Sequence, residues 1–282
     1  MPEQLKYLWS SDFDGTLYEG KRSEASISKE IIETIALWIR YGGYFHLLSS
    51  GSMAGMSRDG FDFIPNLLRT LSNHLSIPDA VSLMRDRISF SMSNGGEHYS
   101  IVDPHKSIME GQLCLDESRY AWVSKQEAIA FCQEMAKQFQ MITLNTDPPV
   151  SGESGRISAI FLKHLSHIDG EDGFTVQERF NDTLRSLRKN LWVRFVREER
   201  SEEESMKRFD AYPLFKGVRI GKGDVVGDLF PQFSSVVYTG DQAQGNDRPV
   251  FDYMKTRREM HAWAVHGPKD VAQVIRKCIE QR

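Results

Sequence analysis

Two aspartates separated by one residue follow an apolar segment near the start of the chain. They belong to the pentapeptide Asp12-Phe13-Asp14-Gly15-Thr16, and the apolar segment spans residues 5–9. Residues two apart on an extended backbone share a face, so one carboxylate can attack a bound group while the other handles protons. Gly15 permits a turn that a residue with a side chain would resist. The alternative for this segment alone is a solvated Asp-Gly turn.

Three further segments carry groups that phosphoryl chemistry requires. Ser50-Gly51 offers a hydroxyl and backbone N–H groups to an anion, and Lys222-Gly223 opens a predicted helix with an ammonium that neutralises phosphate charge. Gly240-Asp241 and Asn246-Asp247 supply the hard oxygen ligands that Mg²⁺ prefers. Carboxylates, hydroxyl, lysine and acidic cluster together are typical of metal-assisted phosphoryl transfer.

Some of these positions have rivals in the sequence. Lys216 competes with Lys222, and we prefer Lys222 because a predicted helix follows it. Ser49 competes with Ser50, and we prefer Ser50 because it directly precedes the glycine. Asp252 is a third candidate, beside Asn246 and Asp247, to complete the metal shell.

Strands and helices alternate at both ends of the sequence, which predicts a parallel sheet that would position these groups. The N-terminal part contains predicted strands at 5–9 and 44–48 and a helix capped by Ser28. The C-terminal third contains a predicted helix over 222–229, strands at 235–238 and 262–265, and a last helix opened by Pro268. The carboxyl ends of parallel strands face the ligand crevice of such a sheet, so the candidate residues are expected to meet there.

The middle of the chain has a different pattern. Capping boxes at Ser124-x-x-Glu127 and Thr175-x-x-Glu178 predict two amphipathic helices. Their expected buried faces are Ala128, Ile129, Cys132, Met135 and Phe139 in the first, and Val176, Phe180, Leu184 and Leu187 in the second. Strands are expected at 88–92, 159–165, 191–196 and 209–212, with the charged run 197–204 as a solvated connection. We therefore predict a Rossmann-like α/β core from residues 1–94 and 214–282, with an inserted α+β domain over residues 95–213.

Composition excludes several other classes of function. The chain of 282 residues has 35 Lys+Arg and 39 Asp+Glu, a formal net charge of −4, which argues against a nucleic-acid or membrane-surface binder. Its apolar runs are shorter than the roughly 20 residues of a membrane helix. The three cysteines lie far apart and early charges interrupt any signal sequence, so a cytoplasmic location is expected.

In their order along the chain, these segments resemble the four motifs of the haloacid dehalogenase (HAD) superfamily. Ser93-Asn94-Gly95-Gly96 also looks like the step that leads into the cap domain of Cof-type sugar phosphatases. The long insertion lies between Ser50 and Lys222, the cap position of the Cof-type, sucrose-phosphatase and phosphomannomutase groups. The resemblance implies an HAD-like core with a cap that selects the substrate.

The resemblance also implies a role for each residue. Asp12 would be the nucleophile that forms an aspartyl-phosphate and also binds Mg²⁺. Asp14 would protonate the leaving group, activate water and offer its backbone carbonyl to the metal. Ser50, Gly51 and Lys222 would hold the phosphoryl oxygens, while Asp241 with Asn246 or Asp247 would complete the metal shell.

Two departures from the family pattern leave the subfamily open. Ser52 stands where many Cof-type members have Arg, and the loop from Asp241 to Asp247 is longer than usual, as in phosphomannomutases. The expected function is a Mg²⁺-dependent phosphatase of a small phosphorylated metabolite, with a sugar phosphate as the expected substrate. A sugar phosphomutase and a non-catalytic ligand-binding protein are the alternatives. Trp122, Phe161 and Trp192 are expected to pack in the core of the inserted domain, and a sugar site lined by them is the alternative.

Overall fold

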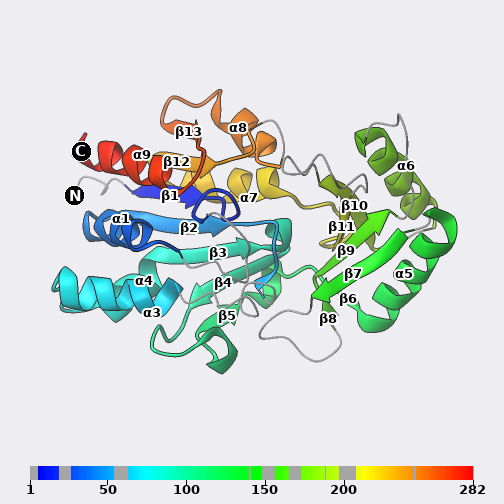
Figure 1. Cartoon of the computed structure of the whole chain (residues 1–282), viewed down its shortest axis with the longest axis horizontal. Helices are drawn as coiled ribbons and strands as arrows, with labels where there is room; N and C mark the ends of the chain where they lie inside the picture. Colours follow the sequence, from blue (N-terminus) through cyan, green and yellow to red (C-terminus); the bar gives the residue numbers. More distant parts are fainter. Residues whose placement is uncertain are drawn as a thin grey trace.

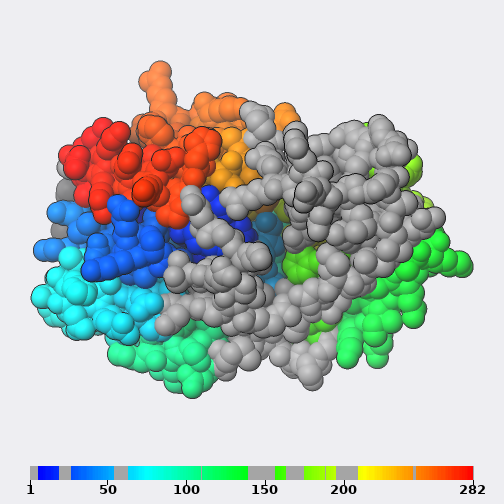
Figure 2. All heavy atoms as spheres, in the orientation of Figure 1, coloured from blue at the N-terminus to red at the C-terminus, as the bar shows by residue number. Residues whose placement is uncertain are grey.

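Two sheets organise the chain, and they lie side by side (Figure 1). The structure is a computed structural model and describes residues 6–18, 27–53, 63–139, 141–147, 156–164, 173–187, 189–196, 208–243 and 246–281. Atoms from both ends of the chain, blue and red, gather on one side of the space-filling view, and green atoms from the middle lie on the other (Figure 2).

The larger sheet has seven strands in the order β13-β12-β1-β2-β3-β4-β5. From β13 to β3 the neighbouring strands are parallel, whereas β4 and β5 add on as antiparallel strands. The bounds are β1 (Tyr7–Ser11), β2 (Tyr44–Leu48), β3 (Ile88–Met92), β4 (Glu97–Ile101), β5 (Leu113–Leu115), β12 (Ser235–Gly240) and β13 (Met260–Ala264). The parallel part aligns the carboxyl ends of β1, β2 and β12 at one edge, where the sequence places the candidate residues.

Helices cover both faces of this sheet. One face packs against α1 (Lys29–Arg40), α3 (Phe63–Arg69), α4 (Ala80–Arg87) and α9 (Pro268–Glu280). The other packs against α7 (Lys222–Leu229) and α8 (Arg248–Met254). Short helical turns join the elements: η2 (Thr70–His74), η3 (Ser93–Gly95), η4 (Ile108–Glu110), η5 (Glu117–Arg119) and η6 (Phe230–Gln232). Within the described ranges, no helix is both long and apolar enough to cross a membrane.

The predicted start of α1 is confirmed in atomic detail. The side chain of Ser28 accepts a hydrogen bond of 3.3 Å from the backbone N–H of Ile31, which satisfies a donor that the first turn leaves unpaired. The apolar residues spaced along one side of this helix are all buried in the larger core: Ile31, Ile32, Ile35, Trp38 and Ile39. Trp38 also donates from its indole nitrogen to the carbonyl of Tyr44 at 2.8 Å, which ties the helix to β2.

The second sheet belongs to a unit between β5 and α7, which we call the inserted unit. Its four antiparallel strands run in the order β10-β11-β9-β7, with a small β6–β8 pair beside them. The bounds are β6 (Val123–Ser124), α5 (Lys125–Phe139), β7 (Met141–Asp147), β8 (Arg156–Ile157), β9 (Ala159–His164), α6 (Gly173–Ser186), β10 (Leu191–Val196) and β11 (Arg208–Pro213). Helices α5 and α6 lie on the side of this sheet away from the larger sheet (Figure 1). Phe131, Val176, Phe180 and Phe209 form the centre of a separate core there.

The predicted class, an α/β core with an inserted α+β unit, is therefore confirmed. The strands predicted at 44–48 and 191–196 and the helix predicted at 222–229 are confirmed as well. The strands predicted at 5–9 and 262–265 lie instead at Tyr7–Ser11 and Met260–Ala264.

We expected the inserted domain to start at residue 95, but the two strands that follow this residue belong to the larger sheet. Strand β4 pairs with β3, and β5 pairs with β4, so both extend the larger sheet and the inserted unit begins near Val123. The strand pairing is not evident from the sequence because antiparallel strands can join a parallel sheet at its edge through a short connection, and their residues look alike in either domain.

Three local predictions in the inserted unit were wrong. Ile129 and Leu187, expected in the core, are 48% and 41% exposed: Ile129 lies at the margin of the buried face of α5, and Leu187 follows the last residue of α6. Thr175 lies inside α6, which begins at Gly173, and so it does not cap that helix. The charged run 197–204 and the side chain of Phe139 lie outside the described residues.

Candidate active site

The aspartates predicted to do chemistry follow neighbouring parallel strands. Asp12 comes directly after β1, and Asp241 directly after β12. The backbone N–H of Asp12 donates to the carbonyl of Thr239 at 2.9 Å, so the register between the two strands continues up to Asp12. This pairing brings two carboxylates to one edge of the sheet, as parallel topology requires.

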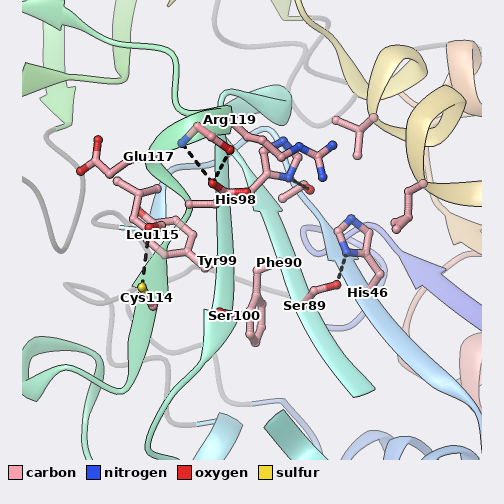
Figure 3. Close-up of a pocket in the computed structure, with 15 residues that line it drawn as sticks. His46, Ser89, Phe90, His98, Tyr99, Ser100, Cys114, Leu115, Glu117 and Arg119 are labelled. Carbon is pink, nitrogen blue, oxygen red and sulfur yellow. Dashed lines mark hydrogen bonds between the residues drawn. The ribbon is translucent and has the colours of Figure 1, made fainter. Parts of the chain in front are cut away.

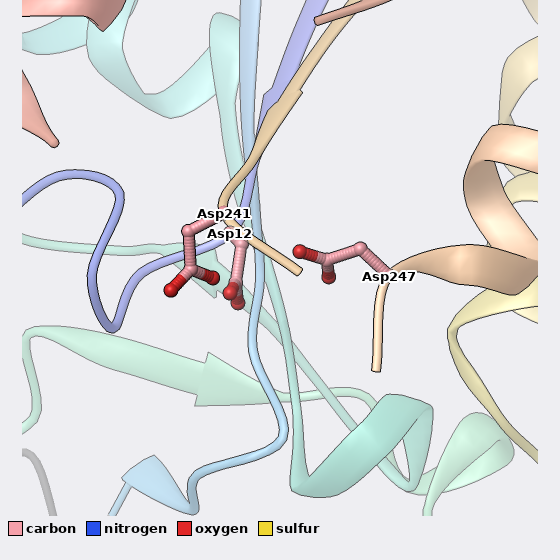
Figure 4. A group of neighbouring side chains, drawn as sticks. All are labelled: Asp12, Asp241 and Asp247. Carbon is pink, nitrogen blue, oxygen red and sulfur yellow. The ribbon is translucent and has the colours of Figure 1, made fainter. Parts of the chain in front are cut away.

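A third aspartate completes this cluster from the start of α8. Asp12, Asp241 and Asp247 each offer one carboxylate oxygen, and these oxygens all lie within 4.8 Å of one another. The three side chains point toward one another (Figure 4). We call these three residues the aspartate cluster. Oxygen atoms at such spacing, from carboxylates alone, suit a hard divalent cation such as Mg²⁺.

The ammonium of Lys222 lies against the aspartate cluster. Its Nζ is 2.8 Å from Oδ1 of Asp12 and 2.6 Å from Oδ1 of Asp247, and the side chain is fully buried. Burial alone lowers the pKa of Lys222, but the carboxylates of Asp12 and Asp247 outweigh it and raise that pKa above its usual value. Lys222 is therefore a permanent cation at the first residue of α7.

The surroundings of Asp12 in the aspartate cluster raise the pKa of its carboxyl group. Burial, followed by repulsion from Asp247, raises the pKa of Asp12 to about 8, although Lys222 acts in the opposite direction. Asp247 is held by more donors: the hydroxyl of Tyr238 at 2.8 Å and the backbone N–H of Gln242 at 3.2 Å. A bound divalent cation would favour the ionised form of these carboxylates.

Two glycines make room for the aspartate cluster. A Cβ on Gly15 would lie 2.3 Å from Oδ2 of Asp241, and Gly15 has a φ of +74°, which side chains disfavour. A Cβ on Gly240 would lie 2.4 Å from Oδ2 of Asp247. The glycine of each motif thus permits the close approach of a carboxylate.

Ser50 follows the carboxyl end of β2 and contacts Asn246, the residue directly before Asp247. The amide of Asn246 donates to the hydroxyl of Ser50 at 2.8 Å. The rival Ser49 is fully buried, and its hydroxyl accepts from the N–H of Gly51 at 3.0 Å. Ser50 therefore presents the partly accessible hydroxyl, while Ser49 shapes the turn.

Side chains of the inserted unit also contact the candidate active site. Arg194 of β10 donates to the amide oxygen of Asn246, and it lies 3.4 Å from the amide oxygen of Asn94. Its guanidinium also pairs with Asp210 at 3.6 Å. Tyr212 of β11 donates to the backbone carbonyl of Ser50 at 3.1 Å. Side chains of the second sheet thus close over the edge of the first.

The structure separates the candidates that the sequence left open. Asp252 is exposed and pairs with Lys255 at 2.8 Å and with Arg248 at 3.3 Å, so it lies outside the aspartate cluster. Lys216 is exposed, with its ammonium over the ring of Phe215. The carboxylate of Asp14 accepts a hydrogen bond from Tyr18 and is not one of the three that converge.

Sequence reasoning missed three residues of this site: Tyr238, Asp210 and Tyr212. Tyr238 shares a face of β12 with Gly240, so the period of two along a strand could have placed it beside the cluster. Asp210 and Arg194 face each other across β10 and β11, and each charged residue lies between apolar neighbours in its strand. A charge in such a strand indicates a partner or a site.

The aromatic residues considered for a sugar site divide between two surroundings. Phe161 and Trp192 are buried beside Tyr212, on the face of the smaller sheet opposite its helices. Trp122 is 43% exposed, with the guanidinium of Arg156 over its ring at 4.7 Å, so the expectation of core packing was wrong there.

Comparison with known proteins identifies the fold. No family model and no curated protein matches the sequence. Among solved structures, N-terminally truncated IMP-nucleotidase of Plasmodium falciparum is similar, with 13% identity and a TM-score of 0.56 over 98% of this chain and 70% of that chain. SMU.1108c from Streptococcus mutans UA159 is also similar, with 13% identity and a TM-score of 0.56 over 97% of this chain and 98% of that chain. This chain thus has the Rossmann-like fold that its resemblance to the HAD superfamily implied, with an added α+β unit.

Proposed function

We propose that this protein is a Mg²⁺-dependent phosphatase that hydrolyses a small phosphorylated metabolite, in the class of phosphoric monoester hydrolases. The observation that carries the proposal is the buried ammonium of Lys222 between Asp12 and Asp247, beside Asp241. Such a set combines a nucleophile, a fixed positive charge and a cation site within a few ångströms. These are the parts that phosphoryl transfer requires.

In this proposal Asp12 attacks phosphorus, the bond to the leaving oxygen breaks, and an aspartyl-phosphate forms. Asp14 gives its proton to the leaving oxygen and then takes a proton from the water that hydrolyses the intermediate. Lys222 stabilises charge on the phosphoryl oxygens, together with the hydroxyl of Ser50 and the backbone of Gly51. Asp12 and Lys222 lie in direct contact at 2.8 Å, so attack and charge stabilisation share one place.

The donor set fits a magnesium ion. Asp12, Asp241 and Asp247 would hold it, with the backbone carbonyl of Asp14 and the side chain of Asn246 as further candidates. When bound, the ion would neutralise charge on the phosphoryl group and on the carboxylates. The buried contacts of Asp247 with Lys222 and Tyr238 favour Asp12 and Asp241 as the main ligands.

The inserted unit would act as a cap that selects the substrate, and we expect a sugar phosphate. Supporting this role, Arg194 and Tyr212 bring its strands against Asn246 and Ser50. Closure of such a cap excludes water from the reaction. With no polybasic tract and no described membrane-spanning helix, we expect neither nucleic acid nor a membrane as partner and place the protein in the cytoplasm.

The test is release of inorganic phosphate from a panel of sugar phosphates and nucleoside monophosphates with Mg²⁺. We expect Asp12→Asn to lower release at least about 10³-fold, because the amide is not a nucleophile. Chelation should also abolish it. The variant must keep the wild-type unfolding curve for the comparison to count.

Two other outcomes would overturn the proposal. Phosphate migration within a hexose phosphate, without net release, would indicate a phosphomutase. Binding of phosphorylated compounds with neither release nor migration would indicate a non-catalytic binding protein.

A further inference from the structure

A second concave site lies on the larger sheet, and none of its residues belongs to the aspartate cluster. It is a pocket of about 570 Å³, lined by residues of β2, β3, β4 and β5 and bordered by α7 and η5 (Figure 3). Pockets of this size hold small molecules. The proposed phosphatase reaction makes no use of it.

The sheet face that forms this pocket is polar, whereas its opposite face is apolar. Alternate residues Ser89 and Ser91 of β3 and His98 and Ser100 of β4 line the pocket, joined by Cys114 of β5. The residues between them on these strands point to the other face and pack in the large core: Phe90, Tyr99, Ile101, Leu113 and Leu115. Val225 and Leu229 of α7 border this face, and the small polar side chains on it suit contact with water or with a polar molecule.

Histidine–serine pairs make up the floor. Nδ1 of His46 lies 2.9 Å from the hydroxyl of Ser89, and Nδ1 of His98 lies 2.8 Å from that of Ser91. His46 is 3% exposed, and its Nε2 has no hydrogen-bond partner within the described part of the chain. Burial lowers the pKa of His46 to about 3 and that of His98 to about 4, so both rings are neutral near pH 7.

Charges at the rim are already paired. Arg119 lies 3.8 Å from Asp228, and Glu117 lies 2.7 Å from Arg156. Asp116 accepts hydrogen bonds from both the backbone and the hydroxyl of Ser118. An anionic ligand would therefore find no unpaired cation here.

Two other ligand classes also fit poorly. Among the described residues, the three converging ligand atoms that a metal needs occur in the aspartate cluster and not in this pocket. An apolar ligand would cover the exposed hydroxyl of Ser100 without offering it a hydrogen-bond partner, which costs the desolvation energy of that group. The lining mixes donors and acceptors with apolar groups, and Phe90 and Tyr99, which also border the pocket, are buried in the large core.

We propose that this pocket binds a neutral, polyhydroxylated small molecule, that is, an unphosphorylated sugar or a polyol. Each hydroxyl of such a ligand both donates and accepts, which matches serine hydroxyls and neutral imidazoles. Val225 and Leu229 of α7 would contact the carbon side of the ligand. Lys222 begins the same helix, so the ligand would contact an element that also carries the ammonium of the aspartate cluster.

The test is a titration of the ¹⁵N-labelled full chain, followed by amide chemical shifts, with myo-inositol, glucose and sucrose as probes. We expect saturable shifts at Ser91, His98, Ser100 and Cys114 with at least one of them. Adenosine, glucose 1-phosphate and Zn²⁺ are the comparison probes. The readout is binding, so it is independent of whether the protein releases phosphate.

Substitutions test whether the amide chemical-shift changes come from a ligand bound in this pocket. Cys114→Trp fills it from an exposed position and should weaken binding at least about tenfold by steric exclusion. Val102→Trp, at an exposed position outside the pocket, is the matched control and should leave the affinity unchanged. If Cys114→Trp does not fold, Ser100→Leu decides the matter, since it removes a hydroxyl at another exposed position.

The proposal is overturned if no polyol gives saturable shifts at these residues. It is also overturned if the pocket-filling variant binds as well as wild type, or if only adenosine, glucose 1-phosphate or Zn²⁺ binds there.

Discussion

At the residue scale, the single ammonium of Lys222 contacts the buried carboxyl groups of Asp12 and Asp247. We expect Lys222→Met to lower the free energy of unfolding by about 3–5 kcal/mol, because it leaves the carboxylate of Asp247 buried without its cation. Urea unfolding at constant pH measures this loss. Adding Asp247→Asn to Lys222→Met should recover part of it, since one uncompensated charge is removed. Equal stability of the single and double variants would contradict the argument.

Gly15 allows a second residue-scale prediction, with a matched control in the same chain. Gly15 and Gly217 have φ values of +74° and +78°, but a Cβ meets Asp241 at the first and nothing within 4 Å at the second. Alanine at either position should cost about 1–2 kcal/mol of stability through backbone strain. Gly15→Ala alone should also displace Asp241 and weaken Mg²⁺ binding, measured by calorimetry. Equal metal affinity in the two variants would refute this role of Gly15.

At the element scale, the start of α5 depends on a reciprocal pair of hydrogen bonds. The N–H of Glu127 donates to the hydroxyl of Ser124 at 3.1 Å, and the N–H of Ser124 donates to the carboxylate of Glu127 at 2.8 Å. We expect Ser124→Ala to lower the free energy of unfolding by about 1 kcal/mol, whereas Ser124→Thr, which keeps the hydroxyl, should change it little. Denaturant unfolding distinguishes the two. Similar losses in both variants would mean that packing, and not the cap, sets this helix start.

At the scale of the whole molecule, buried histidines couple folding to pH. The pKa of His46 is lowered to about 3, against about 6.5 in an unfolded chain, so below pH 6.5 the unfolded state binds more protons. The contribution of His46 to stability is present above pH 6.5 and falls by up to about 1.4 kcal/mol per pH unit below it. Burial raises the pKa of Glu97, which acts in the opposite direction.

Comparison with a His46→Asn variant isolates the histidine from these other groups. Urea unfolding at pH 7, 6 and 5 should show that the stability difference between wild type and variant shrinks, or reverses, as the pH falls. A difference that stays constant over this range would show that His46 is not buried as a neutral ring.

The sequence by itself determined the parts of this protein that depend on neighbouring residues. The N-cap at Ser28, the helix over 222–229 and the glycine after Asp14 follow from local hydrogen bonds and backbone sterics. The order of the motifs along a strand–helix alternation also predicted the sheet class and the edge where Asp12 and Asp241 meet, because parallel strands end on the same side.

Only the tertiary structure decided which distant residues share that edge. It placed Asp247, and not Asp252, against Lys222, and it brought Arg194 of the inserted unit to Asn246. It also added β4 and β5 to the larger sheet and left a pocket beside them. These contacts depend on how far a loop folds back and on which sheet edge a strand joins. Neither is set by spacing in the chain, since the same residues satisfy the local rules in several arrangements.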